Sequence, residues 1–193
     1  RKDFVKVKPT FIAPHPWTIN LLLSNYSNSS KSSLLIGPPP SKDNDANLLS
    51  ILKKKSIVDF DILIKPKGDF KSSIEFWNKH GFSTRTAGIA DKNFYSRLAQ
   101  ILSEYQNIIC PTISSALFFS ASMGKKIITI PEYSYKVYEN MNYLDEVDTE
   151  SLKARDIVKT IINGNLVEIS ELSQFLLGFD YLGEASAIKK EIL

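Results

Sequence analysis

The chain has 193 residues, 43% of them hydrophobic, which is enough to bury one core, or one domain with an appendage. Its formal charge of +3 is mild, and its basic and acidic residues are interleaved, so nothing indicates a nucleic-acid partner. One cysteine and two histidines give neither a disulfide framework nor a metal cluster. No signal peptide and no apolar run of about eighteen residues is visible, so we expect a cytoplasmic protein.

Residues 1–30 are predicted to contain an extended segment, a short helix that starts at Pro16, and a polar loop rich in asparagine and serine. The chain begins at Arg1 without a methionine, and its first residues are typical of the middle of a protein. We therefore expect part of a longer polypeptide. On this interpretation residues 1–30 are an N-terminal extension or a segment between two domains.

From residue 31 to residue 147, short apolar runs alternate with helical segments. Strands are expected at residues 32–36, 60–64, 82–84, 107–110 and 126–130. The helices between them are expected to be capped near Asp43 or Asn44, at Asp69 and at Asp91, and the last to span 113–123. This alternation predicts an α/β fold, a Rossmann-like parallel sheet of about five strands with helices on both faces. Residues 148–193 are predicted to form a helical C-terminal tail.

The stretch "NIICPTISSALFFSASMGKKIITIPEYS", residues 107–134, places two hydroxyls directly after a buried strand, where a helix begins. A helix N-terminus presents unpaired N–H groups and the positive end of the helix dipole, and it needs an oxygen atom. That oxygen belongs either to a capping serine or to a bound phosphate. We expect Ser114 to cap the helix and Ser115 to bind the phosphate, because neighbouring residues cannot aim both hydroxyls the same way.

Ligands of open parallel sheets bind at the carboxyl ends of the strands, where the strand order reverses. Small and basic residues recur in the loops at that edge, which suits a phosphorylated small molecule. The candidate phosphate-binding residues are Lys65, Lys67, Gly68, Thr112, Ser114 and Ser115, and the candidate rim residues are Gly37, Ser41, Lys42 and Arg85. The sequence contains no dinucleotide-binding, P-loop or nucleophile-elbow motif.

The order of these elements resembles the C-terminal, nucleotide-sugar-binding half of a GT-B glycosyltransferase. The resemblance covers about residues 32–135 and is carried by the strand "DILIKPKG" and by "TISSAL", whose helix is followed by "GKKIITI". It is closest to bacterial enzymes of capsule and lipopolysaccharide assembly: sialyltransferases, Kdo transferases and polyol-phosphate polymerases. In that group a His-Pro motif usually ends the first of these strands, where this chain has Lys67 and Gly68. A lysine neutralises a phosphate as a point charge but does not titrate like an imidazole.

The resemblance implies that the chain is the donor-binding half of a transferase, one that moves a sugar from a nucleotide-activated donor to a growing surface glycan. A CMP-linked acidic sugar is the favoured donor, and the acceptor is a glycan or a lipid-linked sugar. The loops around Lys67 and Ser115 would contact the donor's phosphate or ribose, and Glu132 would bind the ribose hydroxyls. No cofactor or metal is expected beyond the nucleotide sugar.

In the family the catalytic base lies in an N-terminal α/β domain, which we expect to lie outside this sequence, so no residue is assigned to that role. The implied partner is that missing domain or a separate subunit, and the implied location is the cytoplasm or the periphery of the inner membrane. Two alternatives stay open. The chain is a non-catalytic interaction module, as the apolar tail at 172–193 suggests, or half of a sugar-nucleotide epimerase.

Overall fold

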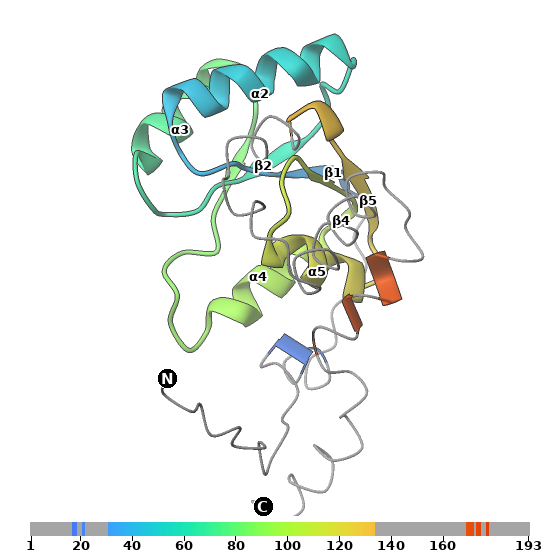
Figure 1. Ribbon diagram of the computed structural model, residues 1–193. Coiled ribbons are helices and arrows are strands. Elements are labelled where there is room, and N and C mark those ends of the chain that lie inside the picture. Colours follow the sequence, from blue (N-terminus) through green and yellow to red (C-terminus); the bar gives the residue numbers. More distant parts are fainter. Residues whose placement is uncertain are drawn as a thin grey trace, which may run out of the picture.

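The computed structural model describes residues 31–133 and, outside that range, residues 17, 18, 21, 169–171, 173, 174 and 177. Five parallel strands form one sheet in the order β3-β2-β1-β4-β5 (Figure 1). The strands are β1 (Lys31–Ile36), β2 (Asp61–Leu63), β3 (Thr84–Arg85), β4 (Tyr105–Cys110) and β5 (Lys126–Thr129). The helices are α2 (Lys42–Lys54), α3 (Phe70–Lys79), α4 (Phe94–Ser103) and α5 (Ser115–Ser122). The predicted α/β, Rossmann-like fold is confirmed.

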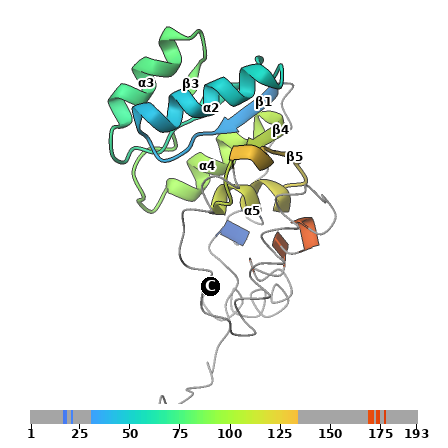
Figure 2. The ribbon, with the colours of Figure 1, turned by 45° about the horizontal axis from the view of Figure 1, so that its top comes forward.

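Helices cover both faces of the sheet, α2 and α3 on one side and α4 and α5 on the other (Figures 1 and 2). Successive residues of a strand point to opposite faces. Accordingly Leu34 and Ile36 pack with α4 and α5, whereas Leu35 between them packs with α2 and α3. Because both faces are buried there, the second halves of the central strands β1 and β4, residues 34–36 and 108–110, are apolar without a polar alternation. The strand order reverses between β1 and β4.

Two of the predicted helix starts are wrong by a few residues. Ser41, and neither Asp43 nor Asn44, caps α2, since its hydroxyl accepts the Asn44 N–H at 3.2 Å. Helix α4 begins at Phe94 after the cap residue Asn93. The residue predicted as its cap, Asp91, belongs to a preceding turn.

Asp69 is the N-cap residue of α3, as predicted, although its side chain makes no capping bond. Helix α5 spans eight residues, shorter than the predicted 113–123, and Ser114 occupies its N-cap position. The chain leaves α3 through Gly81 and α5 through Gly124, both with positive φ, a conformation that glycine adopts without strain.

The described residues of the N-terminal extension and of the C-terminal tail pack against α5. Trp17 is fully buried, stacks on Phe119 with ring centroids 4.4 Å apart, and donates its Nε1–H to Ser122 Oγ at 3.0 Å. The Thr18 hydroxyl donates to the Leu177 carbonyl at 2.8 Å. Helix α5 is therefore covered by the sheet on one side and by these flanking residues on another, which explains why apolar residues occur on nearly every side of it. The rest of the extension and of the tail lies outside the described residues. Within the described residues, no helix is long and apolar enough to cross a membrane.

One carboxylate is buried between α2 and α3. Asp45 is 1% exposed, and its oxygens accept hydrogen bonds from the Ser73 hydroxyl and, at 2.9 Å, from the Trp77 indole N–H. Burial raises the pKa of Asp45 above its ordinary value, and the bonds from Ser73 and Trp77 offset part of that shift. Leu48, Leu49 and Leu52 continue the same buried face of α2.

The raised pKa of Asp45 predicts a pH-dependent contribution to stability. A carboxyl group whose pKa is raised by folding stabilises the folded state fully below its unfolded pKa, and this contribution is lost as pH rises through the folded pKa. The asparagine of Asp45→Asn cannot titrate, so the unfolding free energy of the wild type relative to this variant is expected to fall as pH rises above the ordinary pKa of an aspartate, about 4. Urea denaturation of both proteins at a series of pH values measures it. A difference that stays constant with pH would contradict the assigned direction.

Candidate functional site

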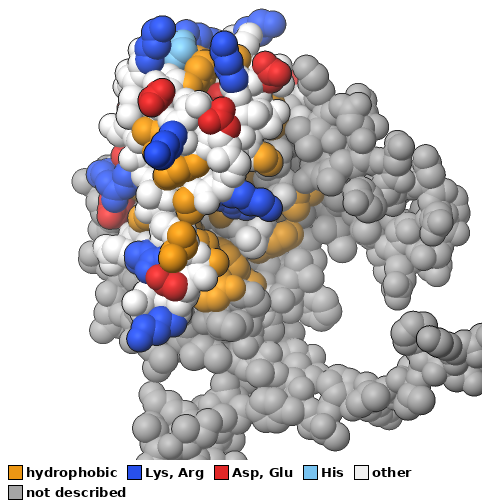
Figure 3. Space-filling model, turned by 90° about the vertical axis from the view of Figure 1, so that its left-hand side faces the viewer, with side chains coloured by type: hydrophobic (Ala, Val, Ile, Leu, Met, Phe, Trp, Pro, Cys, Tyr) orange, Lys and Arg blue, Asp and Glu red, His pale blue; other side chains and the backbone are white. Residues whose placement is uncertain are grey.

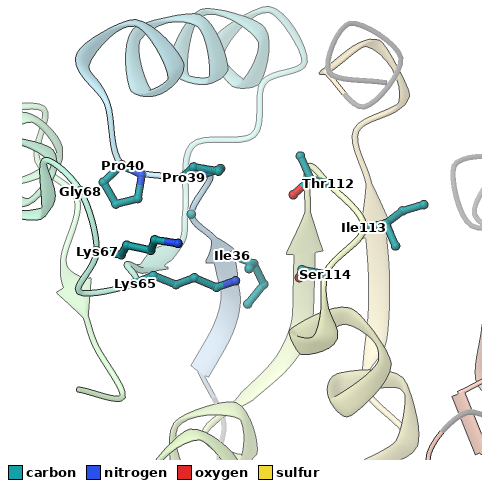
Figure 4. A pocket seen from close by; sticks show the side chains of 10 residues that line it. Ile36, Pro39, Pro40, Lys65, Lys67, Gly68, Thr112, Ile113 and Ser114 are labelled. Carbon is teal, nitrogen blue, oxygen red and sulfur yellow. The ribbon is translucent and has the colours of Figure 1, made fainter. Parts of the chain in front are cut away.

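A cavity of about 380 Å³ opens at the carboxyl ends of β1, β2 and β4 (Figure 4). The loop after β1 contributes residues 37, 39 and 40, the loop after β2 contributes residues 65, 67 and 68, and the loop after β4 contributes residues 112–114. Ile36, the last residue of β1, also lines it. The cavity therefore lies where the strand order reverses, the position at which open α/β sheets bind their ligands.

Two lysines and two hydroxyls face each other across this cavity. Figure 4 shows Lys65 and Lys67 extending from the loop after β2 toward the end of β1, with the hydroxyls of Thr112 and Ser114 opposite them. Ile113 points away to the other side. No acidic residue is among the described residues that line the cavity, and no ion pair that the structure describes includes either lysine. The described wall is thus positive and rich in hydrogen-bond donors.

Ser114 carries the clearest sign of a missing partner. Its backbone is extended (φ −149°, ψ 161°), and its carbonyl accepts the Leu117 N–H at 3.0 Å, as expected of an N-cap residue. Its hydroxyl nevertheless makes no capping bond. Ser114 Oγ is buried and has no hydrogen-bond partner. Among the described residues, no other buried side-chain nitrogen or oxygen atom lacks a partner. A buried hydroxyl without a partner is destabilising, so its retention at a cavity wall points to a ligand.

The two serines thus divide their roles differently from the sequence-based expectation. Ser114 holds the cap position as predicted, and the residue also lines the cavity. Ser115 is exposed and lines a smaller, mostly apolar pocket of about 50 Å³ instead. That pocket shares Ile36 and Lys65 with the main cavity and is closed by Phe94 and other apolar side chains.

Five more of the predicted residues lie at or beside the cavity. Gly37, Gly68 and Thr112 line it together with the two lysines. Ser41 caps α2 and Lys42 begins that helix, and neither lines the cavity. The residues that sequence reasoning did not single out are Pro39, Pro40, Ile36 and Ile113. They complete the apolar part of the wall, and the prolines stand in the very loop that the sequence indicated.

Arg85 and Glu132 are not brought to the cavity, and this corrects their predicted placement. Arg85 is bound to Glu104 at 2.7 Å, in a group that also includes Lys31. Glu132 is exposed, and it pairs with Lys55 at the end of α2 at 2.6 Å. The hydrogen bond from Lys55 holds the pKa of Glu132 below its ordinary value. Both side chains are therefore engaged elsewhere.

One further face of the described residues carries charges of both signs. Figure 3 views the molecule from the side of α3, where basic and acidic side chains are interspersed and hydrophobic ones emerge between them. The residues that the structure describes contain no group of three or more His, Cys, Asp or Glu side chains that could hold a metal ion. Cys110 is buried, and burial raises the pKa of its thiol. No protein-family model, curated protein or solved structure matches the chain.

Gly37 is sterically required where it lines the cavity. Its N–H donates to the Leu63 carbonyl at 2.9 Å, and a Cβ built on Gly37 would lie 2.9 Å from that same oxygen. Gly37→Ala is therefore expected to push β1 and β2 apart and to lower the unfolding free energy by about 1–3 kcal/mol, as overpacking does. Chemical denaturation measures the change. A loss below about 0.5 kcal/mol, typical of a surface substitution, would contradict this account of the site.

Proposed function

We propose that the cavity binds the phosphate of a nucleotide-activated sugar, and that the chain is the donor-binding half of a glycosyltransferase. The observation that carries the proposal is the buried, unpartnered Ser114 hydroxyl, which faces Lys65 and Lys67 at the N-terminus of α5. Ammonium groups, helix N-terminal N–H groups and hydroxyls are the donors that proteins direct at phosphate. The resemblance of the chain to GT-B transferases adds support for the sugar.

The same groups supply the catalytic chemistry expected of such a domain. When the bond between the sugar's anomeric carbon and the phosphate oxygen breaks, the departing nucleotide gains one negative charge. Lys65 and Lys67 and the positive end of α5 stabilise that charge as it develops, because they are already in place before the reaction. Thr112 and Ser114 orient the phosphate by hydrogen bonding. The acceptor's base belongs to another domain or subunit.

The proposed donor is a CMP-linked acidic sugar, and the proposed acceptor is a growing bacterial surface glycan. Such a donor carries one charge on its phosphodiester and one on its carboxylate. Two lysines match those two charges. The proposed partner is a second α/β domain or subunit that closes the open side of the cavity and brings the acceptor.

Calorimetric titration of the chain with CMP, UDP, GDP and cytidine tests the proposal. Saturable binding of at least one nucleotide is expected, together with much weaker binding of cytidine, which lacks the phosphate. The absence of saturable binding for all three nucleotides would overturn the proposal and favour a non-catalytic interaction module. Transfer of a labelled sugar by the chain together with its proposed partner domain, as opposed to epimerisation of that sugar, separates the transferase from the epimerase.

A further inference from the structure

The buried carboxylate of Asp45 lies directly behind the loops that line the cavity. Its Oδ1 accepts the Trp77 Nε1–H at 2.9 Å, and its Oδ2 accepts the Ser73 hydroxyl hydrogen. Ser73 and Trp77 both belong to α3, whereas Asp45 belongs to α2. All three side chains are at most 2% exposed. Water therefore does not compete for these bonds, which fix α3 against α2.

Each helix is tied to a cavity loop within its first turn. The Asp45 N–H donates to the Ser41 carbonyl at 3.0 Å, at the end of the loop that carries Pro39 and Pro40. In the same way the Ser73 N–H donates to the Asp69 carbonyl at 3.1 Å, at the end of the loop that carries Lys67 and Gly68. One side-chain pair, Asp45 and Ser73, thus connects the two loops through a single turn of each helix.

The two loops also lie close together at the cavity. A Cβ built on Gly68 would lie 3.5 Å from the Pro40 carbonyl oxygen, which is ordinary van der Waals contact. Any shift of α3 along α2 would therefore move the lysine-bearing loop against the Pro39–Pro40 loop. Lys67 reaches the cavity from the loop that would shift, whereas Ser114 reaches it from the far side of β1. The separation of Lys67 from Ser114 depends on where α3 is held.

We propose that Asp45 is a positioning residue for the phosphate site, an inference that rests on the proposed function. Its carboxylate holds the loop of Lys65 and Lys67 at the distance from Ser114 that a phosphate requires. Two neutral donors on one helix orient both oxygens, so the carboxylate acts as a fixed link between α2 and α3. An acid buried without a cationic partner among the described residues is destabilising, and a positioning role accounts for it.

The test compares CMP and CDP affinity, by calorimetry, for the wild-type chain, Asp45→Ala, Asp45→Asn and a control, Leu52→Ala. Leu52 is buried on the same face of α2 near the far end of the helix, so its truncation lowers stability away from the cavity. Asp45→Ala is expected to weaken binding on the order of 10-fold, as misplacement of a binding group does. Asp45→Asn keeps binding close to wild type, because its amide still accepts from Trp77 and donates to Ser73. Leu52→Ala binds like the wild type.

Amide hydrogen exchange gives a second measurement that does not need a ligand. Exchange at residues 65–69 is expected to become faster in Asp45→Ala and to stay unchanged in Leu52→Ala. Trp77→Phe removes only one of the two hydrogen-bond donors to Asp45, and it replaces Asp45→Ala in the test if that variant does not fold. It is expected to give a smaller loss of affinity in the same direction.

Each outcome decides between the two proposals. If the wild type binds CMP or CDP and Asp45→Ala binds equally well, the positioning role is wrong while the phosphate site stands. If Leu52→Ala loses as much affinity as Asp45→Ala, Asp45 contributes stability only, and the positioning role is again wrong. If the wild type binds neither CMP nor CDP, the proposed CMP-linked donor is wrong. Unchanged exchange at residues 65–69 in Asp45→Ala would then reject the link between Asp45 and the loop as well.

Discussion

Replacing Lys65 and Lys67 together by alanine is expected to abolish most of the chain's nucleotide affinity. A hydrogen bond to a charged group contributes about 1.5–3 kcal/mol, so the double variant should bind at least about 100-fold more weakly than the wild type. Both side chains are exposed and have no ion-pair partner among the described residues, so the fold should lose little stability. Calorimetric titration and a melting curve measure the two effects side by side.

Lys126→Ala is the matched control for that experiment. Lys126 is exposed at the start of β5, at the opposite edge of the sheet from the cavity. The Lys126→Ala substitution removes one positive charge without changing the cavity. We expect the nucleotide affinity to stay unchanged at physiological salt, where the screening length is about 8 Å. If this single change weakened binding as much as either cavity lysine alone, attraction by the overall charge would explain the binding, and the site would be misplaced.

Ser114→Ala is expected to separate stability from binding. The Ser114 hydroxyl is buried without a hydrogen-bond partner and makes no capping bond, so its removal should leave the unfolding free energy unchanged or raise it by about 1 kcal/mol. If the hydroxyl binds a phosphate, the same change should weaken nucleotide binding by about 10- to 100-fold. Denaturation and titration of the same preparation give both numbers.

Ser115→Ala provides the comparison for Ser114→Ala. Ser115 is exposed, begins α5 and lines only the smaller neighbouring pocket, so little change in either quantity is expected. The opposite pattern would restore the roles expected from the sequence, with Ser114 as a cap and Ser115 as the ligand. A loss of stability with unchanged affinity in Ser114→Ala would leave the serine pair a structural cap.

The sequence predicted the fold because the chain repeats one simple pattern. Apolar runs buried on both faces became strands, and the helices α3 and α5 ended just before the expected glycines, Gly81 and Gly124. Cap positions were harder. The segment "SKDNDAN" contains several residues able to cap α2, and only the backbone conformation at Ser41 shows which one does so. Asp91 was predicted to cap α4 for the same reason, whereas the cap residue is Asn93.

The site was predicted in part, since position after a strand identifies a loop but not the direction of a side chain. Arg85 and Glu132 were expected to follow strands, but Arg85 is the last residue of β3, and the two side chains form ion pairs with Glu104 and Lys55, which come from other elements. Local spacing contains no sign of such pairs. The orientation of the Ser114 hydroxyl was equally beyond a sequence argument.

Asp45 was missed although the sequence contains a signal for it. In "DNDANLLSIL" it stands three, four and seven residues before Leu48, Leu49 and Leu52, on the buried face of α2. An acid on an apolar helical face requires donors from a neighbour. Nothing in the chain indicated that Ser73 and Trp77 would supply them.

A crystal structure of the chain with CMP or CDP bound tests the central claim most directly. The account predicts a phosphate group in the cavity between β1 and β4, with an oxygen within hydrogen-bonding distance of Ser114 Oγ and with Lys65 or Lys67 directed at it. A nucleotide bound elsewhere, with the Ser114 hydroxyl still unpartnered, would contradict it.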